Sequence, residues 1–187
     1  MRSESLRAEL NQPFDVVLDG QGNLYFSDAH NHCVRRVERD SGTIATVVGT
    51  GQAGYSGDGG AATRAQLNSP YGIALDTANN LYIVDRLNAC IRLVEAATGI
   101  IHTLAGTGQP GYAGDGGPAP QAQLQEPNDI VLDSHGRAFI ADVQDHRVRV
   151  IDLASRIIST FAGTGDAGSS GDGGPPSRAT LLGPRAL

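Results

Sequence analysis

The sequence predicts an all-β fold made of three four-stranded blades of a β-propeller. Three observations support this: a repeat with a period of 57 residues, four short strands in each repeat, and 25 glycines among 187 residues. Glycine reaches backbone conformations that other residues avoid, so this number of glycines indicates many turns. The hydrophobic content of 40% is too high for a disordered chain.

The repeat runs through the chain without insertion or deletion. Residues that coincide in successive copies include Leu10, Leu67, Leu124 and Leu181; Pro13, Pro70, Pro127 and Pro184; and Asp58, Asp115 and Asp172. We therefore divide a single partial propeller, residues 1–187, into repeats 10–66, 67–123 and 124–180. Residues 1–9 and 181–187 match the end and the start of a repeat, and we interpret them as partial flanking copies.

Each repeat contains four runs rich in β-branched and aromatic residues, separated by turn signals. The expected strands are Asp15–Asp19, Leu24–Asp28, Cys33–Glu38 and Ile44–Gly49; Gly72–Asp76, Leu81–Asp85, Cys90–Glu95 and Ile101–Gly106; and Asp129–Asp133, Ala138–Asp142, Arg147–Asp152 and Ile158–Gly163. A meander of this size cannot bury both its faces alone, and radial stacking of such sheets buries them. Short antiparallel turns favour a propeller over a stacked solenoid.

The repeated motifs resemble the NHL repeat. The pattern L-x-x-P-x-(G/D)-(I/V)-x-L-D is followed by N-L-Y-(F/I)-x-D-x-x-N and by (V/I)-R. The further stretch A-G-T-G-x-x-G-Y-x-G-D-G-G is similar to long-repeat bacterial NHL proteins and to the propeller of teneurins. The resemblance covers nearly the whole chain and implies a closed six-bladed ring, of which this chain would be half.

Three blades are too few to close a propeller, which usually has about 4–8. Either the chain is a fragment of a longer protein, or two chains associate into a six-bladed ring. An open half-ring exposes apolar blade faces, which favours association. We therefore expect self-association, with one of the two duplicated end segments displaced at each junction.

Two cysteines, Cys33 and Cys90, lie one repeat apart and so occupy equivalent strand positions in neighbouring blades. Such positions should be separated by more than the roughly 7 Å between Cα atoms that a disulfide allows. We expect two free, partly buried thiols, which leaves the redox compartment undefined. The sequence defines no cellular location.

The net charge of −6 is spread along the chain, with no cluster of basic residues. Nucleic-acid binding normally requires a basic patch, so we expect no nucleic-acid partner. The sequence also lacks an apolar run near the roughly 18 residues that cross a membrane, so we expect no membrane partner. The expected ligand is a protein, peptide or glycan.

One face of the propeller should carry the turns between second and third strands together with the long loops Thr50–Ser69 and Thr107–Glu126. Loops of this length are often functional. The residues expected on this binding face are His30, Asn31, His32, Arg86, Asn88, Gln144, His146, Tyr55 and Tyr112. The histidines break the repeat, since the middle copy has Leu87 and Ala89 in their place, and histidine is a common metal ligand and acid–base group.

Residues that recur in every repeat are better explained by architecture than by chemistry. We expect Asp58, Asp115 and Asp172 to accept hydrogen bonds from local backbone amides of their loops. We expect Asp28, Asp85 and Asp142 to shape a turn with Asn31, Asn88 and Asp145. The recurring Arg35, Arg92 and Arg149 follow them and are placed to pair with a neighbouring aspartate.

The residues after the repeated proline differ between copies: Phe14-Asp15, Tyr71-Gly72 and Asn128-Asp129. Strand one lines the channel of a propeller, so these side chains should lie near its mouth. In a ring of two chains, Asp15 and Asp129 would supply four carboxylates, a set of hard oxygen ligands suited to calcium. We expect no cofactor, with a calcium ion between these carboxylates as the one exception that the residues allow. A G-x-G-x-x-G match at Gly49 is rejected as a dinucleotide site because no helix follows it.

These features favour a non-catalytic binding scaffold that uses the loop-bearing face. No polar cluster converges to suggest chemistry, so we do not expect an enzyme. The alternative is a metal-dependent enzyme centred on the channel, similar to propeller lyases and lactonases. Because propellers host unrelated activities, the fold alone does not decide between them.

Overall fold

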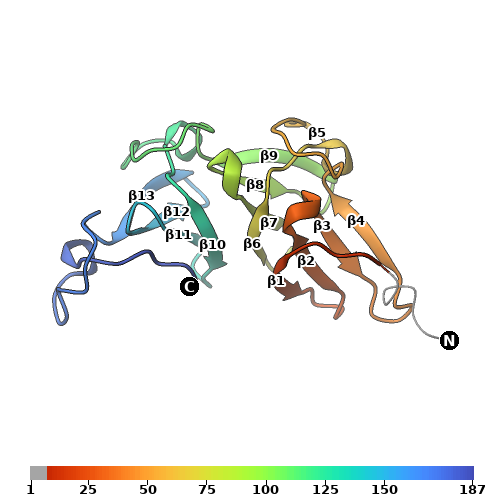
Figure 1. The fold of residues 1–187 in the computed structure, drawn as a ribbon, viewed down its shortest axis with the longest axis horizontal. Coiled ribbons are helices and arrows are strands. Elements are labelled where there is room, and N and C mark those ends of the chain that lie inside the picture. Colours follow the sequence, from red (N-terminus) through yellow and green to blue (C-terminus); the bar gives the residue numbers. More distant parts are fainter. Residues whose placement is uncertain (1–7) are drawn as a thin grey trace.

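The computed structural model describes residues 8–187, so Met1–Arg7 of the first partial repeat lie outside the described residues. Three antiparallel sheets follow one another along the chain and fan out side by side (Figure 1). Blade 1 consists of β1 (Pro13–Leu18), β2 (Leu24–Asp28), β3 (Cys33–Val37) and β4 (Ile44–Val48). Blade 2 consists of β6 (Pro70–Leu75), β7 (Leu81–Asp85), β8 (Cys90–Val94) and β9 (Ile100–Ala105). Blade 3 consists of β10 (Pro127–Leu132), β11 (Arg137–Asp142), β12 (Arg147–Asp152) and β13 (Ile157–Ala162).

The twelve strands expected from the sequence are all present, and their ends lie within two residues of the expected positions. The first strands begin earlier than expected, at Pro13, Pro70 and Pro127. Each of these prolines stands opposite the aspartate that ends the second strand, and the register shifts directly after it. Proline lacks an N–H group and is accepted at the first position of a strand beside such an irregularity.

The strand order identifies the inner and outer edges of each blade. Within a blade the strands are arranged in sequence order, so the first and fourth strands form opposite edges. The first strands of successive blades contact one another, β1 with β6 and β6 with β10 (Figure 1). These three strands form the inner side of the arrangement, and the fourth strands form its outer side. The chain is therefore three consecutive blades of a β-propeller.

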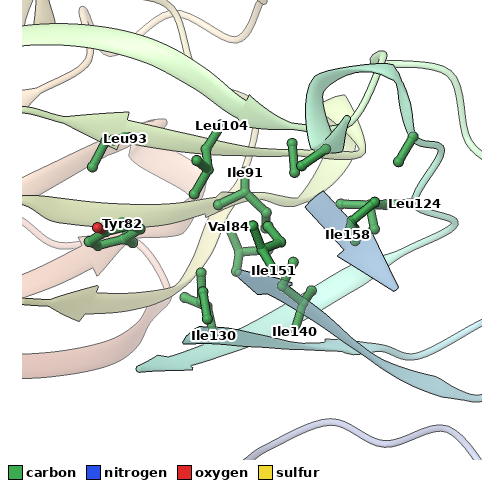
Figure 2. Close-up of a cluster of buried hydrophobic side chains, with 14 of the residues drawn as sticks. Tyr82, Val84, Ile91, Leu93, Leu104, Leu124, Ile130, Ile140, Ile151 and Ile158 are labelled. Atoms are coloured by element: carbon green, nitrogen blue, oxygen red, sulfur yellow. The ribbon is translucent and has the colours of Figure 1, made fainter. Parts of the chain in front are cut away.

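The hydrophobic core lies between the blades. Val34 and Val48 of blade 1 pack against Leu67, Ile73 and Ile83, which belong to blade 2 or to the loop that leads to it. One repeat later, the equivalent side chains form the next core, in which Ile91, Leu104 and Val84 of blade 2 lie close to Ile130, Ile140, Ile151 and Ile158 of blade 3 (Figure 2). The repeat thus produces the same contact at each junction, which is why the blades stack.

The long loop after each blade crosses to the outer edge of the next blade. Residues 50–69 place a fifth strand, β5 (Gly60–Ala61), beside β9, and then return inward through the 3₁₀ helix η3 (Ala62–Arg64). The loop after blade 2 repeats the path, with an isolated bridge between Pro118 and Ile157 and the 3₁₀ helix η5 (Ala119–Gln121). The sequence did not predict this extra strand. Each loop therefore belongs structurally to two blades.

A glycine is required where each loop leaves the fourth strand. Gly49 has a φ of 96°, and a Cβ atom there would lie 2.5 Å from the backbone oxygen of His32. Gly106 repeats both features against Ala89. The close approach allows the loop to turn over the start of the third strand, so any larger residue would shift it.

Candidate ligand-binding face

The predicted binding residues lie on one face, which we call the loop face. It contains the ends of the second strands, the starts of the first and third strands, and the long loops. Two 3₁₀ helices, η2 (Ala29–Asn31) and η4 (Arg86–Asn88), join the second and third strands there. Opposite each of them, the first strand begins, since Pro13 pairs with Asp28 and Pro70 pairs with Asp85.

Buried carboxylates hold the turns of the loop face together. Asp85 is fully buried and accepts hydrogen bonds from the Asn68 backbone amide at 2.7 Å, Asn88 Nδ2 at 2.9 Å and Arg92 Nη1 at 3.3 Å. Asp28 repeats all three contacts, with the Asn11 amide, Asn31 Nδ2 and Arg35 Nη1. Burial raises the pKa of Asp85 to about 6. The predicted architectural role of these aspartates is confirmed.

The aspartates of the long loops bind the next blade. Asp58 Oδ1 lies 2.5 Å from Nη2 of the fully buried Arg92, and Asp58 Oδ2 accepts the backbone amide of Thr103 at 3.2 Å. Asp115 makes the same two contacts with Arg149 and Thr160. The prediction of local backbone hydrogen bonds is therefore wrong for Asp58 and Asp115, because the loop folds outward and not onto itself. The expected pairing of the repeated arginines with a neighbouring aspartate is confirmed.

Tyr55 and Tyr112 lie on the outer rim of the loop face. Their hydroxyl groups are 2.7 Å from Thr103 Oγ1 and 3.1 Å from Thr160 Oγ1, on the fourth strands. The guanidinium groups of Arg92 and Arg149 lie 4.9 Å from the respective ring centres. The Arg147 guanidinium lies closer still to the Tyr112 ring, at 3.7 Å from its centre. Each ring thus helps to hold the loop, while nearly half of each side chain is exposed. These tyrosines lie far from the inner strands.

Two of the histidines that break the repeat bind backbone groups. His32 Nδ1 accepts the Ser69 amide at 3.1 Å, and His146 Nδ1 accepts the Gly183 amide at 3.0 Å. Both contacts fix the segment that leads into the next first strand. His30 and Gln144 are exposed at the tips of their turns. Within residues 8–187, no group of three or more His, Cys, Asp or Glu side chains is arranged to hold a metal ion.

A cluster that joins all three blades lies at the inner side of the loop face. The Phe14 and Tyr71 rings are stacked, with centres 4.0 Å apart and planes inclined by 18°. The Arg86 guanidinium lies 4.6 Å from the Tyr71 ring centre and forms an ion pair with Glu126. We call Phe14, Tyr71, Arg86 and Glu126 the aromatic platform. It combines an exposed aromatic surface with a charged edge.

The sequence identified only part of the aromatic platform. Arg86 was among the predicted binding residues, and Phe14 and Tyr71 were expected near the channel mouth, but Glu126 was missed. A usable signal was present, because these positions break the repeat: Glu126 corresponds to Gln12 and Ser69. Stacking between residues 57 apart becomes visible only when the blades are assembled.

Asp15 connects the first strands of blades 1 and 2, and Asp129 connects the first strand of blade 3 to the last residue of the chain. Asp15 Oδ2 accepts the Ile73 amide, and Asp129 Oδ2 accepts the Leu187 amide, both at 2.8 Å. Burial, and to a smaller extent the charge of Asp15, raises the pKa of Asp129. Both carboxylates already accept backbone hydrogen bonds. The calcium site that we expected from two chains stays a prediction.

Comparison with known proteins places this geometry in a family. A family model of the teneurin NHL domain matches residues 50–111, which contain the long loop and blade 2. NHL repeat-containing protein 2 of Bos taurus is 28% identical over 165 residues, which cover 83% of this chain and 23% of that protein. The chain belongs to the NHL-repeat β-propeller family. It spans less than a quarter of the length of the first curated NHL relatives that it matches.

Solved structures agree with the NHL propeller fold. A Bacteroides thetaiotaomicron protein of unknown function superimposes with a TM-score of 0.73 at 22% identity, covering 94% of this chain and 42% of that one. A streptogramin B lyase superimposes with a TM-score of 0.57 at 12% identity, covering 81% of this chain and 40% of the lyase. At these identities the likeness concerns the fold alone. In the described part of the chain, no helix is long and apolar enough to cross a membrane.

Proposed function

We propose that this NHL propeller segment is a non-catalytic binding module that recognises a peptide segment of a protein partner on its aromatic platform. The observation that carries the proposal is the stacked Phe14–Tyr71 pair edged by the Arg86–Glu126 ion pair. It lies on the loop face, where inner strands of neighbouring blades meet.

The composition of the platform supports recognition of a protein. Tyrosine and arginine are enriched among the residues that dominate binding energy in protein interfaces. An aromatic surface surrounded by polar groups also matches the apolar centre and polar rim of such interfaces. Here the Arg86 and Glu126 side chains are both partly exposed, so they are accessible to the main chain or to charged side chains of a ligand.

The remaining polar groups of the loop face support binding without chemistry. Asp85, His32 and His146 each accept a backbone amide, as described above. Groups held in this way are poor general bases, because the atom that would take the proton already accepts a hydrogen bond. A catalytic function would therefore have to come from residues outside these pairs.

Peptide selection on the immobilised chain tests the proposal. Peptides enriched from a random display library should bind Phe14→Ala and Tyr71→Ala with a dissociation constant at least tenfold higher than wild type. Tyr112→Ala is a matched control, since Tyr112 is 43% exposed on the outer rim and Phe14 is 45% exposed on the platform. Binding to Tyr112→Ala should remain within about threefold of wild type. Equal binding to all three variants, or selection of glycans but no peptides on parallel arrays, would contradict the proposal.

The catalytic alternative, a metal-dependent lyase or lactonase centred on the channel, has its own test. One structural neighbour is a streptogramin B lyase, although only the fold is shared. We expect a streptogramin B antibiotic to remain unchanged after incubation with the chain and a divalent cation, as followed by liquid chromatography. Conversion to a new product, lost in Asp129→Asn, would favour the enzyme.

A further inference from the structure

Blade 1 exposes apolar side chains that its neighbours keep covered. Leu10 is 46% exposed, whereas Leu67, one repeat later, is 0% exposed. Val16 is 55% exposed, whereas the equivalent Ile73 is 2% exposed. We call the surface formed by Leu10, Val16, Leu18 and Leu24 the head face. Its counterpart in blade 2 packs against Val34 and Val48 of the preceding blade.

A polar groove adjoins the head face. Asn31, Cys33, Arg35 and Thr46 line an open cavity of about 500 Å³ at the outer half of blade 1. In blade 2 the long loop fills the corresponding space: Asn88 Nδ2 donates to the Gly54 oxygen at 2.8 Å, and Arg92 Nη2 donates to the Ser56 oxygen at 3.2 Å. Arg92 also pairs with Asp58. In residues 8–187 the only ion pair of Arg35 is with Asp28.

The chain carries a third copy of the groove-filling loop. Gly168, Ser170 and Asp172 correspond to Gly54, Ser56 and Asp58 in the repeat. Asp172 is exposed and forms no ion pair within residues 8–187, whereas Asp58 and Asp115 each pair with a buried arginine. Beside this loop, Phe161 of blade 3 is half-exposed. We call blade 3 and residues 166–174 together the tail face.

We propose that the tail face of one copy binds the head face of a second copy, and that two copies close a six-bladed ring. The contacts follow from the two junctions within the chain. Asp172 pairs with Arg35 of the second copy and accepts its Thr46 amide, as Asp58 does with Arg92 and Thr103. The Gly168 oxygen accepts Asn31 Nδ2, as Gly54 does with Asn88. The opposite charges and the matching groove select a second copy as the occupant.

The two junctions of such a ring are identical, so the assembly has twofold symmetry and leaves no blade face open. One hydrogen bond that both junctions within the chain contain is absent from the junction between copies. Ala62 and Ala119 donate their backbone amides to the turn after the third strand, whereas Pro176 has no N–H group. The junction between copies is therefore weaker by one backbone hydrogen bond than the junctions within the chain.

The last residues of the chain now occupy the place of the incoming strand. The Leu187 amide binds Asp129 as the Ile73 amide binds Asp15, and the Gly183 amide binds His146 as the Ser69 amide binds His32. Leu10–Val16 of the second copy align with Leu181–Leu187 in the repeat. Ring closure thus requires Leu10–Val16 to displace Leu181–Leu187.

Light scattering of the 187-residue chain at a series of concentrations tests the proposal. The wild type should change from 19.4 kDa to twice that mass as concentration rises. Asp172→Arg should raise the dissociation constant at least tenfold, because the new arginine would repel Arg35 of the second copy. Asp166→Arg is the matched control: Asp166 lies in the same exposed loop, but Gln52 and Gln109 take its place in the other repeats. Its dissociation constant should stay within about threefold of wild type.

Two further measurements locate the junction. In the dimer, the Thr46 amide should exchange with deuterium at least tenfold more slowly than in the monomer, because Asp172 accepts it. Deletion of Leu181–Leu187 should lower the dissociation constant, since no segment then needs to be displaced. A monomer at all concentrations, larger open oligomers, or equal effects of Asp172→Arg and Asp166→Arg would overturn the proposal. A deletion variant that fails to fold leaves the other two measurements decisive.

Discussion

Blade 1 and blade 2 share many residues at equivalent positions, including Leu10 and Leu67, and Arg35 and Arg92, yet the surroundings of these residues differ. Leu67, Ile73 and Arg92 of blade 2 are buried beneath blade 1 and the loop that leaves it. Leu10 and Val16 of blade 1 are exposed, and Arg35 lines an open groove. The two positions are equivalent in the repeat, so the difference comes from the neighbouring blade. Blade 2 packs against blade 1, whereas within residues 8–187 no blade packs against the corresponding side of blade 1. Equivalent substitutions in the two blades should therefore have unequal effects.

The largest difference is expected for the repeated arginine. Arg92→Met removes the cation that neutralises the buried Asp85 and the loop residue Asp58, and should destabilise the monomer by about 3–5 kcal/mol. Arg35→Met should cost about 1–2 kcal/mol, because Arg35 is partly exposed in the open groove and its one ion pair within residues 8–187, with Asp28, is long at 3.5 Å. Urea unfolding at neutral pH measures both. Equal losses would show that the loop contributes little to the environment of Arg92.

The next difference concerns the apolar contact between blades. Leu67→Ala should destabilise by about 2–5 kcal/mol, because a fully buried leucine leaves a cavity. Leu10→Ala should cost less than about 1 kcal/mol at a concentration where the chain is monomeric. Thermal unfolding of both variants provides the comparison. A large loss for Leu10→Ala in the monomer would mean that the head face is covered by the chain itself.

A smaller effect is expected from the pH dependence of blade 2. Burial raises the pKa of Asp85 from 3.8 to about 6, so the folded state binds this proton more tightly than the unfolded chain does. Its contribution to the free energy of unfolding is therefore greatest below pH 3.8 and decreases as the pH rises to about 6. In Asp85→Asn this decrease should be absent. Urea unfolding at about pH 4 and pH 7 tests this; the same slope in both proteins would assign it to another group.

The smallest effect concerns the two thiols, which are free and buried. Burial raises the pKa of both Cys33 and Cys90, so both should react slowly with a thiol reagent in the folded monomer. Cys33 lines the open groove, whereas the loop covers the equivalent position in blade 2. Cys33 should therefore react before Cys90, as peptide mapping of the labelled protein would show. A native disulfide between them would contradict the blade spacing.

The sequence predicted the fold well and the candidate binding site in part. The strands, the turns at Asp28 and Asp85 and the pairing of Arg92 follow from patterns that repeat, and repetition identifies architecture. The stack of Phe14 on Tyr71 could not be predicted, because it joins two positions that differ between repeats. The partner of Asp58 was also missed, since the sequence does not show on which blade the loop will lie.

By itself, the sequence determined the blade. Its alternating apolar residues, its glycine-rich turns and its period of 57 residues require four-stranded sheets that bury their faces against one another. The tertiary structure decided which copies of each repeated residue are buried and which are exposed. Burial depends on the neighbouring blade, so residues with the same local sequence become a core in blade 2 and an open surface in blade 1.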